Sequence, residues 1–218
     1  MKASGKTAVE RLLSISSGPL ASPPVQLPKL LDRYTLGGDL FNLLKLMNGF
    51  YAFEAALHVF PVSSRDCMSL EEWNSDSFWR SGYRDLAEGL LFFAEDALQD
   101  QFCLSAEGIV RFESETGRRA FIAPTIEDWA GTTLGSYAQQ TGWILASRWQ
   151  AENGPIPAGK RLMPRTPFFL GGAYSLSNLW VGDSLEGMRF KADLALQTRN
   201  LRDGAQVRVA LGKKPQIQ

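Results

Sequence analysis

The sequence is poor in the residues that most often carry catalysis, metal binding and covalent cross-links. It has one histidine and two cysteines among 218 residues. His58 is therefore the one imidazole base that a hydrolytic triad could use, and Cys67 and Cys103 have no close spacing typical of a metal knuckle or a redox pair. We expect no metal site, no cofactor and two reduced thiols, of which a buried position is the ordinary one.

Long apolar runs are also missing. No segment approaches the roughly 20 apolar residues that span a bilayer. Near the N-terminus the short run from Leu12 to Ile15 is interrupted by Ser14 and followed by Gly18 and Pro19, which disfavours a signal peptide. We therefore expect a soluble, cytoplasmic protein without a membrane partner.

Charge of one sign is not in excess over the whole chain, because 23 Lys and Arg residues balance 23 Asp and Glu residues. The balance hides two segments of opposite sign. From Asp66 to Glu115 twelve acidic residues stand against three basic ones, and from Trp143 to Lys214 eleven basic residues stand against five acidic ones. We favour mutual neutralisation or solvated faces over a functional patch. A shared acidic face would instead attract a basic protein and repel nucleic acid.

Apolar runs separated by turn residues predict an antiparallel meander in the middle of the chain. With a hydrophobic fraction of 44%, the chain can bury a substantial core. The expected strands are Leu90–Phe93, Phe102–Leu104, Ile109–Phe112 and Ala120–Ile122, joined by turns at Ala106–Gly108 and Glu113–Gly117.

Helical spacing and capping residues predict further elements around this meander. The predicted helices are 39–47 with Asp39 as cap, 70–83 behind a Ser69/Glu72 capping box, 125–150, and 183–201; the predicted strands are 56–60, 168–170, 179–181 and 206–211; the predicted loop is 153–159. Clustered strands with helices around them indicate an α+β fold with a mostly antiparallel central sheet. We expect a flexible segment over residues 1–24 and one domain over 25–218, with a C-terminal helix–strand extension.

Few residues suggest catalysis or the binding of a phosphate or metal ion. Ser4-Gly5-Lys6-Thr7 lacks the earlier glycine and preceding strand of a phosphate loop. His58 with Cys67 could form a base and thiol pair, but a packed or surface imidazole is the more frequent case. The carboxylates of Glu95, Asp96 and Asp100 could bind a hard cation or act as an acid and base pair, although a turn that exposes its charges is more frequent.

Trp73 and Trp79 are the aromatic residues that best fit a protein interface. Their neighbours Glu71, Glu72, Asp76 and Arg80 complete a composition typical of a binding hot spot.

Four segments resemble the SUKH superfamily, which includes fungal cell-wall synthesis regulators and bacterial immunity proteins. They are Leu46–Pro61, Glu72–Asn74 together with Trp79 and Tyr83, Phe92–Arg118, and Pro167–Tyr174 together with Asn178–Leu179. One departure is Leu98-Gln99-Asp100, where members of the family often have a turn with glycine.

The resemblance implies a single-domain SUKH-like fold and a non-enzymatic immunity protein that neutralises a bacterial toxin, such as a nuclease, by direct binding. The residues that we expect to contact the partner are Glu71, Glu72, Trp73, Trp79, Glu95, Asp96, Asp100 and Phe102. A regulatory or scaffolding protein without a toxin is the first alternative. An unrecognised enzyme or ligand-binding protein is the second, and it requires a pocket that gathers His58, Cys67 or the Glu95 cluster, with shifted pKa values. The sequence leaves the oligomeric state open.

Overall fold

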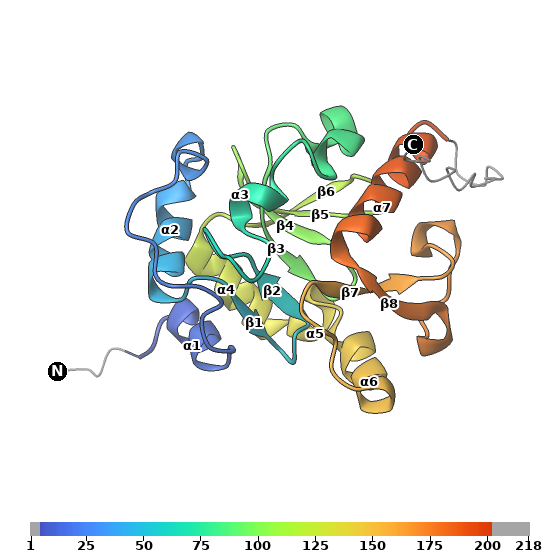
Figure 1. Ribbon diagram of the computed structural model, residues 1–218, viewed down its shortest axis with the longest axis horizontal. Coiled ribbons are helices and arrows are strands. Elements are labelled where there is room, and N and C mark those ends of the chain that lie inside the picture. Colours follow the sequence, from blue (N-terminus) through green and yellow to red (C-terminus); the bar gives the residue numbers. More distant parts are fainter. Residues whose placement is uncertain (1–4, 202–218) are drawn as a thin grey trace.

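The computed structural model describes residues 5–201 and has an α+β architecture (Figure 1). Six strands form one antiparallel sheet in the order of the chain, and two more form a separate hairpin. The sheet strands are β1 (Phe50–Ala52), β2 (Leu57–Val59), β3 (Leu91–Asp96), β4 (Gln101–Ser105), β5 (Gly108–Phe112) and β6 (Arg119–Ala123); the hairpin strands are β7 (Lys160–Pro164) and β8 (Leu179–Asp183). The predicted central meander and fold class are therefore confirmed.

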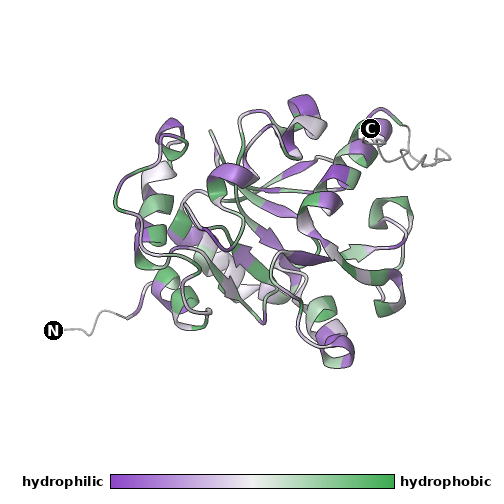
Figure 2. Cartoon of the chain, in the orientation of Figure 1, coloured by the Kyte–Doolittle hydropathy of each residue, from purple (hydrophilic) through white to green (hydrophobic). Residues whose placement is uncertain are grey.

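Helices surround the sheet. The α-helices are α1 (Ala8–Ser14), α2 (Gly37–Leu46), α3 (Leu70–Trp73), α4 (Ile126–Gly135), α5 (Tyr137–Gln140), α6 (Trp143–Asn153) and α7 (Ser184–Thr198); the 3-10 helices are η1 (Leu31–Arg33), η2 (Arg80–Ala87), η3 (Phe168–Leu170) and η4 (Leu176–Asn178). Hydrophobic and hydrophilic positions alternate along α7 (Figure 2), and its buried positions include Met188, Ala192 and Ala195. This pattern lets one side of α7 join the core.

Aromatic side chains fill both sides of the sheet. On one side Trp129 of α4 packs against Phe102, with ring centroids 5.7 Å apart. On the other side Trp79 packs against Phe92 at 4.7 Å. Phe102 and Cys103 are consecutive in β4, and Phe92 is the partner of Cys103 across the strands, so Phe102 and Phe92 lie on opposite faces of the pleat.

The N-terminal segment, which the sequence suggested to be loosely held, contacts the rest of the fold through α1. The Thr7 hydroxyl caps α1, and the backbone amides of Ala8 and Val9 donate to the carboxylate of Glu127 at the start of α4. The Leu12 side chain is completely buried in the main core. Burial of this leucine gives the segment a tertiary anchor that its Ser- and Pro-rich composition did not reveal.

Several predicted elements differ from those in the structure. The Ser69 capping box is present, but α3 ends at Trp73, and the chain resumes helical geometry only at η2. Asp39 lies in the first turn of α2 and does not cap it. The predicted helix over 125–150 is divided into α4, α5 and α6, with Gly142 at a positive φ of 66° immediately before α6.

In the C-terminal half of the chain, the differences between the predicted and the observed elements concern strands. Residues 168–170 form η3, and strand β7 was not anticipated. Strand β8 and helix α7 agree with the predicted strand 179–181 and the predicted helix 183–201, and Asp183 caps α7. The predicted strand 206–211 lies outside the described residues.

Candidate functional site

A cleft of about 530 Å³ opens where the β5–β6 turn meets α6, α7 and the loop that follows β7. We call it the arginine–aromatic cleft. Its wall residues are Asp96, Leu98, Asp100, Arg111, Glu113, Glu115, Thr116, Arg118, Ala138, Gln139, Gly142, Ile144, Leu145, Arg148, Phe168, Phe169, Tyr174 and Lys191. Its volume lies within the range typical of ligand sites in proteins.

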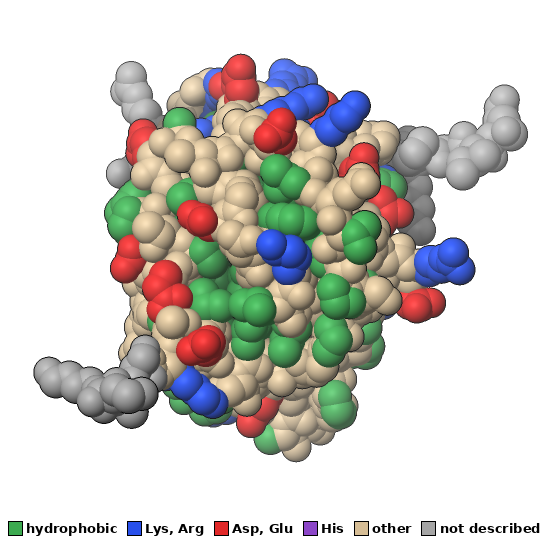
Figure 3. All heavy atoms as spheres, turned by 90° about the vertical axis from the view of Figure 1, so that its left-hand side faces the viewer, with side chains coloured by type: hydrophobic (Ala, Val, Ile, Leu, Met, Phe, Trp, Pro, Cys, Tyr) green, Lys and Arg blue, Asp and Glu red, His purple; other side chains and the backbone are tan. Residues whose placement is uncertain are grey.

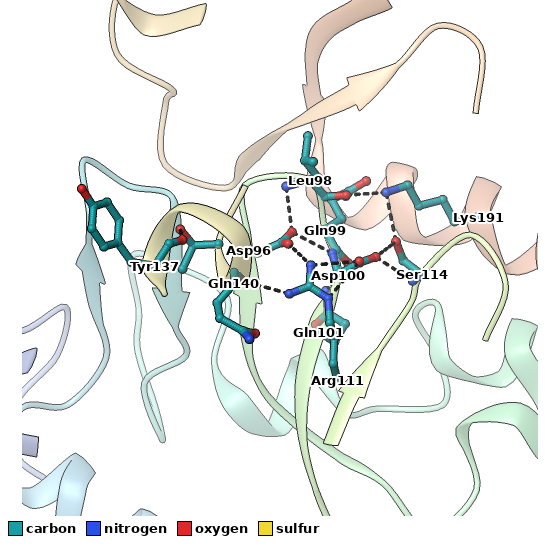
Figure 4. A network of polar contacts seen from close by, with 11 residues as sticks. Asp96, Leu98, Gln99, Asp100, Gln101, Arg111, Ser114, Tyr137, Gln140 and Lys191 are labelled. Carbon is teal, nitrogen blue, oxygen red and sulfur yellow. Dashed lines mark hydrogen bonds and ion pairs between the residues drawn. The ribbon is translucent and has the colours of Figure 1, made fainter. Parts of the chain in front are cut away.

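An ion network surrounds Arg111 on one side of the cleft (Figure 4). Arg111 Nη2 lies 2.5 Å from Asp96 Oδ2 and 3.0 Å from Asp100 Oδ2, and Arg111 Nη1 donates to the backbone oxygen of Gln140 at 2.7 Å. Asp96 is completely buried. One guanidinium thus joins two strands of the sheet to the end of α5.

The tight turn after β3 explains how Asp96 and Asp100 come together. Asp96 Oδ1 accepts hydrogen bonds from the amides of Leu98 at 2.8 Å and Asp100 at 2.9 Å. Gln99 takes a positive φ of 74°, a conformation that favours glycine, and its Nε2 donates to the Ser184 backbone oxygen at 2.7 Å. The turn keeps a glycine-like geometry without glycine because side-chain hydrogen bonds hold it on both sides.

Lys191 of α7 extends the network. Its buried ammonium donates to the Leu98 backbone oxygen at 2.5 Å and to Ser114 Oγ at 3.0 Å, and Ser114 donates to Asp100 Oδ1. Two carboxylates and two cations therefore stand together, so this part of the cleft is close to neutral. Because these charges pair with one another inside the protein, they are not available to attract a binding partner.

The pKa values reflect this packing. Burial raises the pKa of Asp96 to about 6, with Arg111 opposing the rise and Asp100 adding to it. Burial also acts to raise the pKa of Asp100, but the positive charges of Arg111 and Lys191 hold it below its usual range. The two carboxyls consequently differ in acidity.

The rim of the cleft is aromatic and cationic. Tyr174 is 72% exposed and Phe169 is 41% exposed, and Tyr174 stacks on Phe168 with ring centroids 4.1 Å apart. The Arg118 guanidinium lies over the Phe169 ring at 5.9 Å. Arg148 of α6 completes the rim, so aromatic and arginine side chains face solvent together.

Glu115 fixes the aromatic part of the rim. This buried side chain accepts a hydrogen bond from the Phe169 amide at 2.8 Å, at the start of η3. Its second oxygen, Oε1, has no hydrogen-bond partner among the described residues. The β5–β6 turn and the loop after β7 are therefore joined by one carboxylate.

A second, smaller cavity of about 200 Å³ lies beside His58. His58 Nδ1 lies 3.1 Å from Glu95 Oε1, which also lies 3.0 Å from Arg161 Nε, and Ser184 Oγ donates to Glu95 Oε2 at 2.8 Å. Cys67 lies on the wall of the same cavity. His58, Cys67 and Glu95, which the sequence named for an enzyme or ligand-binding alternative, thus line one cavity, whereas Asp96 and Asp100 of the Glu95 cluster lie outside it.

Burial lowers the pKa of His58, with the hydrogen bond to Glu95 opposing the shift. Burial acts to raise the pKa of Glu95, but Arg161 and His58 hold it below its usual range. With Glu95 ionised, the proton of neutral His58 is assigned to Nδ1, which leaves a lone pair on Nε2. His58 Nε2 has no partner among residues 5–201.

The structure separates the residues that the sequence suggested for partner binding. Trp73 and Trp79 are each 1% exposed and Phe102 is completely buried, so these rings are core residues instead of surface anchors. Glu95 and Asp96 are buried on different walls, one in the His58 cavity and one in the cleft, because successive side chains of a strand point to opposite faces. Of the acidic candidates, Glu71 and Glu72 are exposed, whereas Asp100 is only partly so.

The residues that form the rim were not singled out as contacts from the sequence. Phe168 and Phe169 lie between Pro167 and the Gly171-Gly172 pair, and Tyr174 follows two residues after it, which is a usable sign of an aromatic loop. Arg118 and Arg148 gave no such sign. They share one cleft because α6 and the β5–β6 turn both line it.

A further apolar surface lies on the side of the molecule formed by α1 and α2 (Figure 3). Exposed apolar side chains from this part of the chain are Ile15, Val25, Leu27 and Leu46. We assign it no function, because no charge pattern on it identifies an occupant.

Comparison with known proteins supplies a fold and no activity. No protein-family model matches the sequence, and no curated protein matches it. The crystal structure of Atu4351 from Agrobacterium tumefaciens is similar, with a TM-score of 0.54 and 13% identity, over 84% of this chain and 88% of that chain. At this identity the similarity concerns the fold alone.

None of the helices within residues 5–201 combines the length and apolar character needed to cross a bilayer. The same residues contain no cluster of three or more His, Cys, Asp or Glu side chains placed to hold a metal ion.

Proposed function

We propose that this protein is a non-catalytic binding protein that uses the arginine–aromatic cleft to bind another protein. The observation that carries the proposal is the composition of the rim, where exposed Phe169 and Tyr174 lie with Arg118 and Arg148 around one concavity. Aromatic residues and arginine are the residue types most enriched at energetic centres of protein interfaces.

The proposed partner is a bacterial toxin, which the protein would neutralise by direct binding. The support for this partner is the resemblance of four sequence segments to the SUKH superfamily, with its immunity proteins. A regulatory or scaffolding role without a toxin shares the same binding chemistry, and the identity of the partner distinguishes the two.

The arrangement of charges changes the binding model. Glu95, Asp96 and Asp100 pair with cations inside the protein, so they cannot form the acidic face that the sequence suggested. Steering by negative charge would depend on exposed carboxylates outside the cleft, such as Glu71 and Glu72.

The test is binding and growth rescue with a toxin domain encoded beside this gene. Wild-type protein should bind the purified domain in calorimetry and restore growth on co-expression. Tyr174→Ala should weaken binding roughly tenfold or more, the loss expected for a hot-spot residue. Trp180→Ala is the matched control, because Trp180 is an exposed aromatic residue outside the cleft. Equal affinities of all three proteins would exclude the cleft, and absence of binding to the domain would favour the regulatory alternative.

The His58 cavity favours a second candidate function, the binding of a small polar ligand. His58 lines this cavity, and its buried Nε2 offers an acceptor without a partner among the described residues. A nuclear magnetic resonance titration with acetamide, whose N–H groups can donate to this nitrogen, should shift the His58 ring signals in a saturable way. Unchanged signals at saturating probe would count against this candidate.

A further inference from the structure

We propose that the occupant of the arginine–aromatic cleft is an acidic segment of the partner protein, with a carboxylate held by Arg118 and Arg148 beside an apolar or aromatic side chain. This inference rests on the proposed function. It is opposite in sign to the basic partner that a shared acidic face of the central segment would attract.

Two arginines of the cleft have no ion-pair partner among the described residues. The cleft wall contains four carboxylates and four cations, but Asp96, Asp100, Arg111 and Lys191 belong to the internal network. Arg118 and Arg148 are exposed, and no carboxylate of residues 5–201 lies within ion-pair distance of either guanidinium. A bound carboxylate would give them the partner that the fold does not supply.

The two remaining carboxylates lie deeper than the two arginines. Glu115 is buried and accepts a hydrogen bond from the Phe169 amide. Glu113 is partly buried and accepts a hydrogen bond from the Thr116 hydroxyl at 2.9 Å. These neutral donors leave both negative charges in place, so a carboxylate at the mouth of the cleft is favoured by the exposure of Arg118 and Arg148 and not by a positive total charge.

The cleft also offers apolar side chains that an apolar or aromatic residue of the bound segment can contact. Phe168 and Tyr174 present a stacked aromatic pair, and Ile144 on the α6 side is also exposed. Arg118 already lies over Phe169, which restricts its guanidinium before binding and lowers the entropic cost of an ion pair. The cleft thus offers apolar contact directly beside cationic groups.

The exposure of Tyr174 favours a protein segment over a small molecule as the occupant. Tyr174, at 72% exposure, rises out of the cleft, and a ligand confined to the concavity would leave much of this ring in water. A chain segment that enters the cleft and continues across the rim would cover it. Burial of such an aromatic surface is a characteristic source of affinity between proteins.

The experiment is selection from a displayed library of random twelve-residue peptides on the purified full chain. We expect enriched peptides to be net negative and to contain an aromatic or large aliphatic residue. A synthetic peptide of the enriched sequence should bind at least about tenfold more weakly to R118Q/R148Q than to wild type, and its affinity should fall as salt is raised. R165Q is the matched control, because Arg165 is exposed and unpaired among residues 5–201 but lies outside the cleft.

Three outcomes would overturn the inference: enrichment of basic or neutral peptides, equal binding to wild type and R118Q/R148Q, or no enrichment at all. Circular dichroism of the variants checks that they remain folded. The proposed function fails by a separate result, which is toxin binding that Tyr174→Ala leaves unchanged. If Tyr174→Ala weakens toxin binding and R118Q/R148Q does not, the cleft stands as the interface and only the acidic segment is refuted.

Discussion

Replacing Arg111 with methionine should destabilise the protein strongly and in a pH-dependent way. Arg111→Met keeps an unbranched apolar side chain near Phe102 but removes the cation that lies 2.5 Å from Asp96 and 3.0 Å from Asp100. Asp96 is completely buried, so its carboxylate would lose its closest countercharge without gaining water. Removal of one partner from a buried ion pair costs about 3 kcal/mol or more, which sets the expected loss near neutral pH.

The direction of the pH effect follows from the pKa of Asp96. Its folded value of about 6 lies above the unfolded value of about 3.9. The protonated carboxyl therefore favours the folded state, and this contribution is lost as pH rises through 6. Without Arg111 the folded pKa rises further, so the difference between wild type and variant should shrink by about 1 to 2 kcal/mol between about pH 7.5 and pH 5.

Urea unfolding followed by tryptophan fluorescence at these two pH values measures the effect. Arg119→Met on the neighbouring strand is the control, because Arg119 is exposed and donates to backbone oxygens only. It should cost less than about 1 kcal/mol at both pH values. A loss for Arg111→Met that is equally large at both pH values would show that packing, and not charge, explains its role.

Three further predictions concern other parts of the fold, each measured by urea unfolding. Ser69→Ala removes a capping box and should cost about 1 kcal/mol, and an unchanged midpoint would contradict the role of the cap. Burial lowers the pKa of folded His58 despite its hydrogen bond to Glu95, so below pH 6.5 the unfolded state binds the proton first and the wild-type protein loses stability, with a slope that approaches about 1.4 kcal/mol per pH unit. His58→Gln should abolish this pH dependence. Parallel pH profiles of variant and wild type would refute this. Gly187→Ala should cost about 1 to 3 kcal/mol, because the new methyl group would lie 2.3 Å from Gln99 Oε1. Adding Gln99→Gly should recover part of that loss, and a double variant less stable than Gly187→Ala would argue against the clash.

The two buried ion clusters agree with the internal neutralisation that the sequence favoured and show why the acidic segment from Asp66 to Glu115 does not form one shared acidic face. A count of Asp and Glu from Asp66 to Glu115 does not show which carboxylates turn inward. Asp96 pairs with Arg111, which lies two strands away in the sheet. Glu95 pairs with Arg161, which belongs to a hairpin more than sixty residues later in the chain. Long-range pairing of this kind has no local pattern in the chain.

Elements whose causes are local could be predicted from the order of the residues alone. The central strands follow from apolar runs separated by turn residues, and the start of α3 follows from the Ser69 capping box. Both depend on residues within a few positions of one another, so a pattern in one dimension is sufficient.

Contacts between distant parts of the chain set where the helices end and which side chains reach the surface. Trp73 and Trp79 fill the core because the sheet offers an apolar face to them, whereas Phe169 and Tyr174 stay exposed because η3 lies at the rim. Aromatic residues serve both environments, since their apolar area stabilises a core and an interface alike. The cleft exists because α6 and the loop after β7 are brought to the β5–β6 turn, and that arrangement depends on contacts between residues far apart in the sequence.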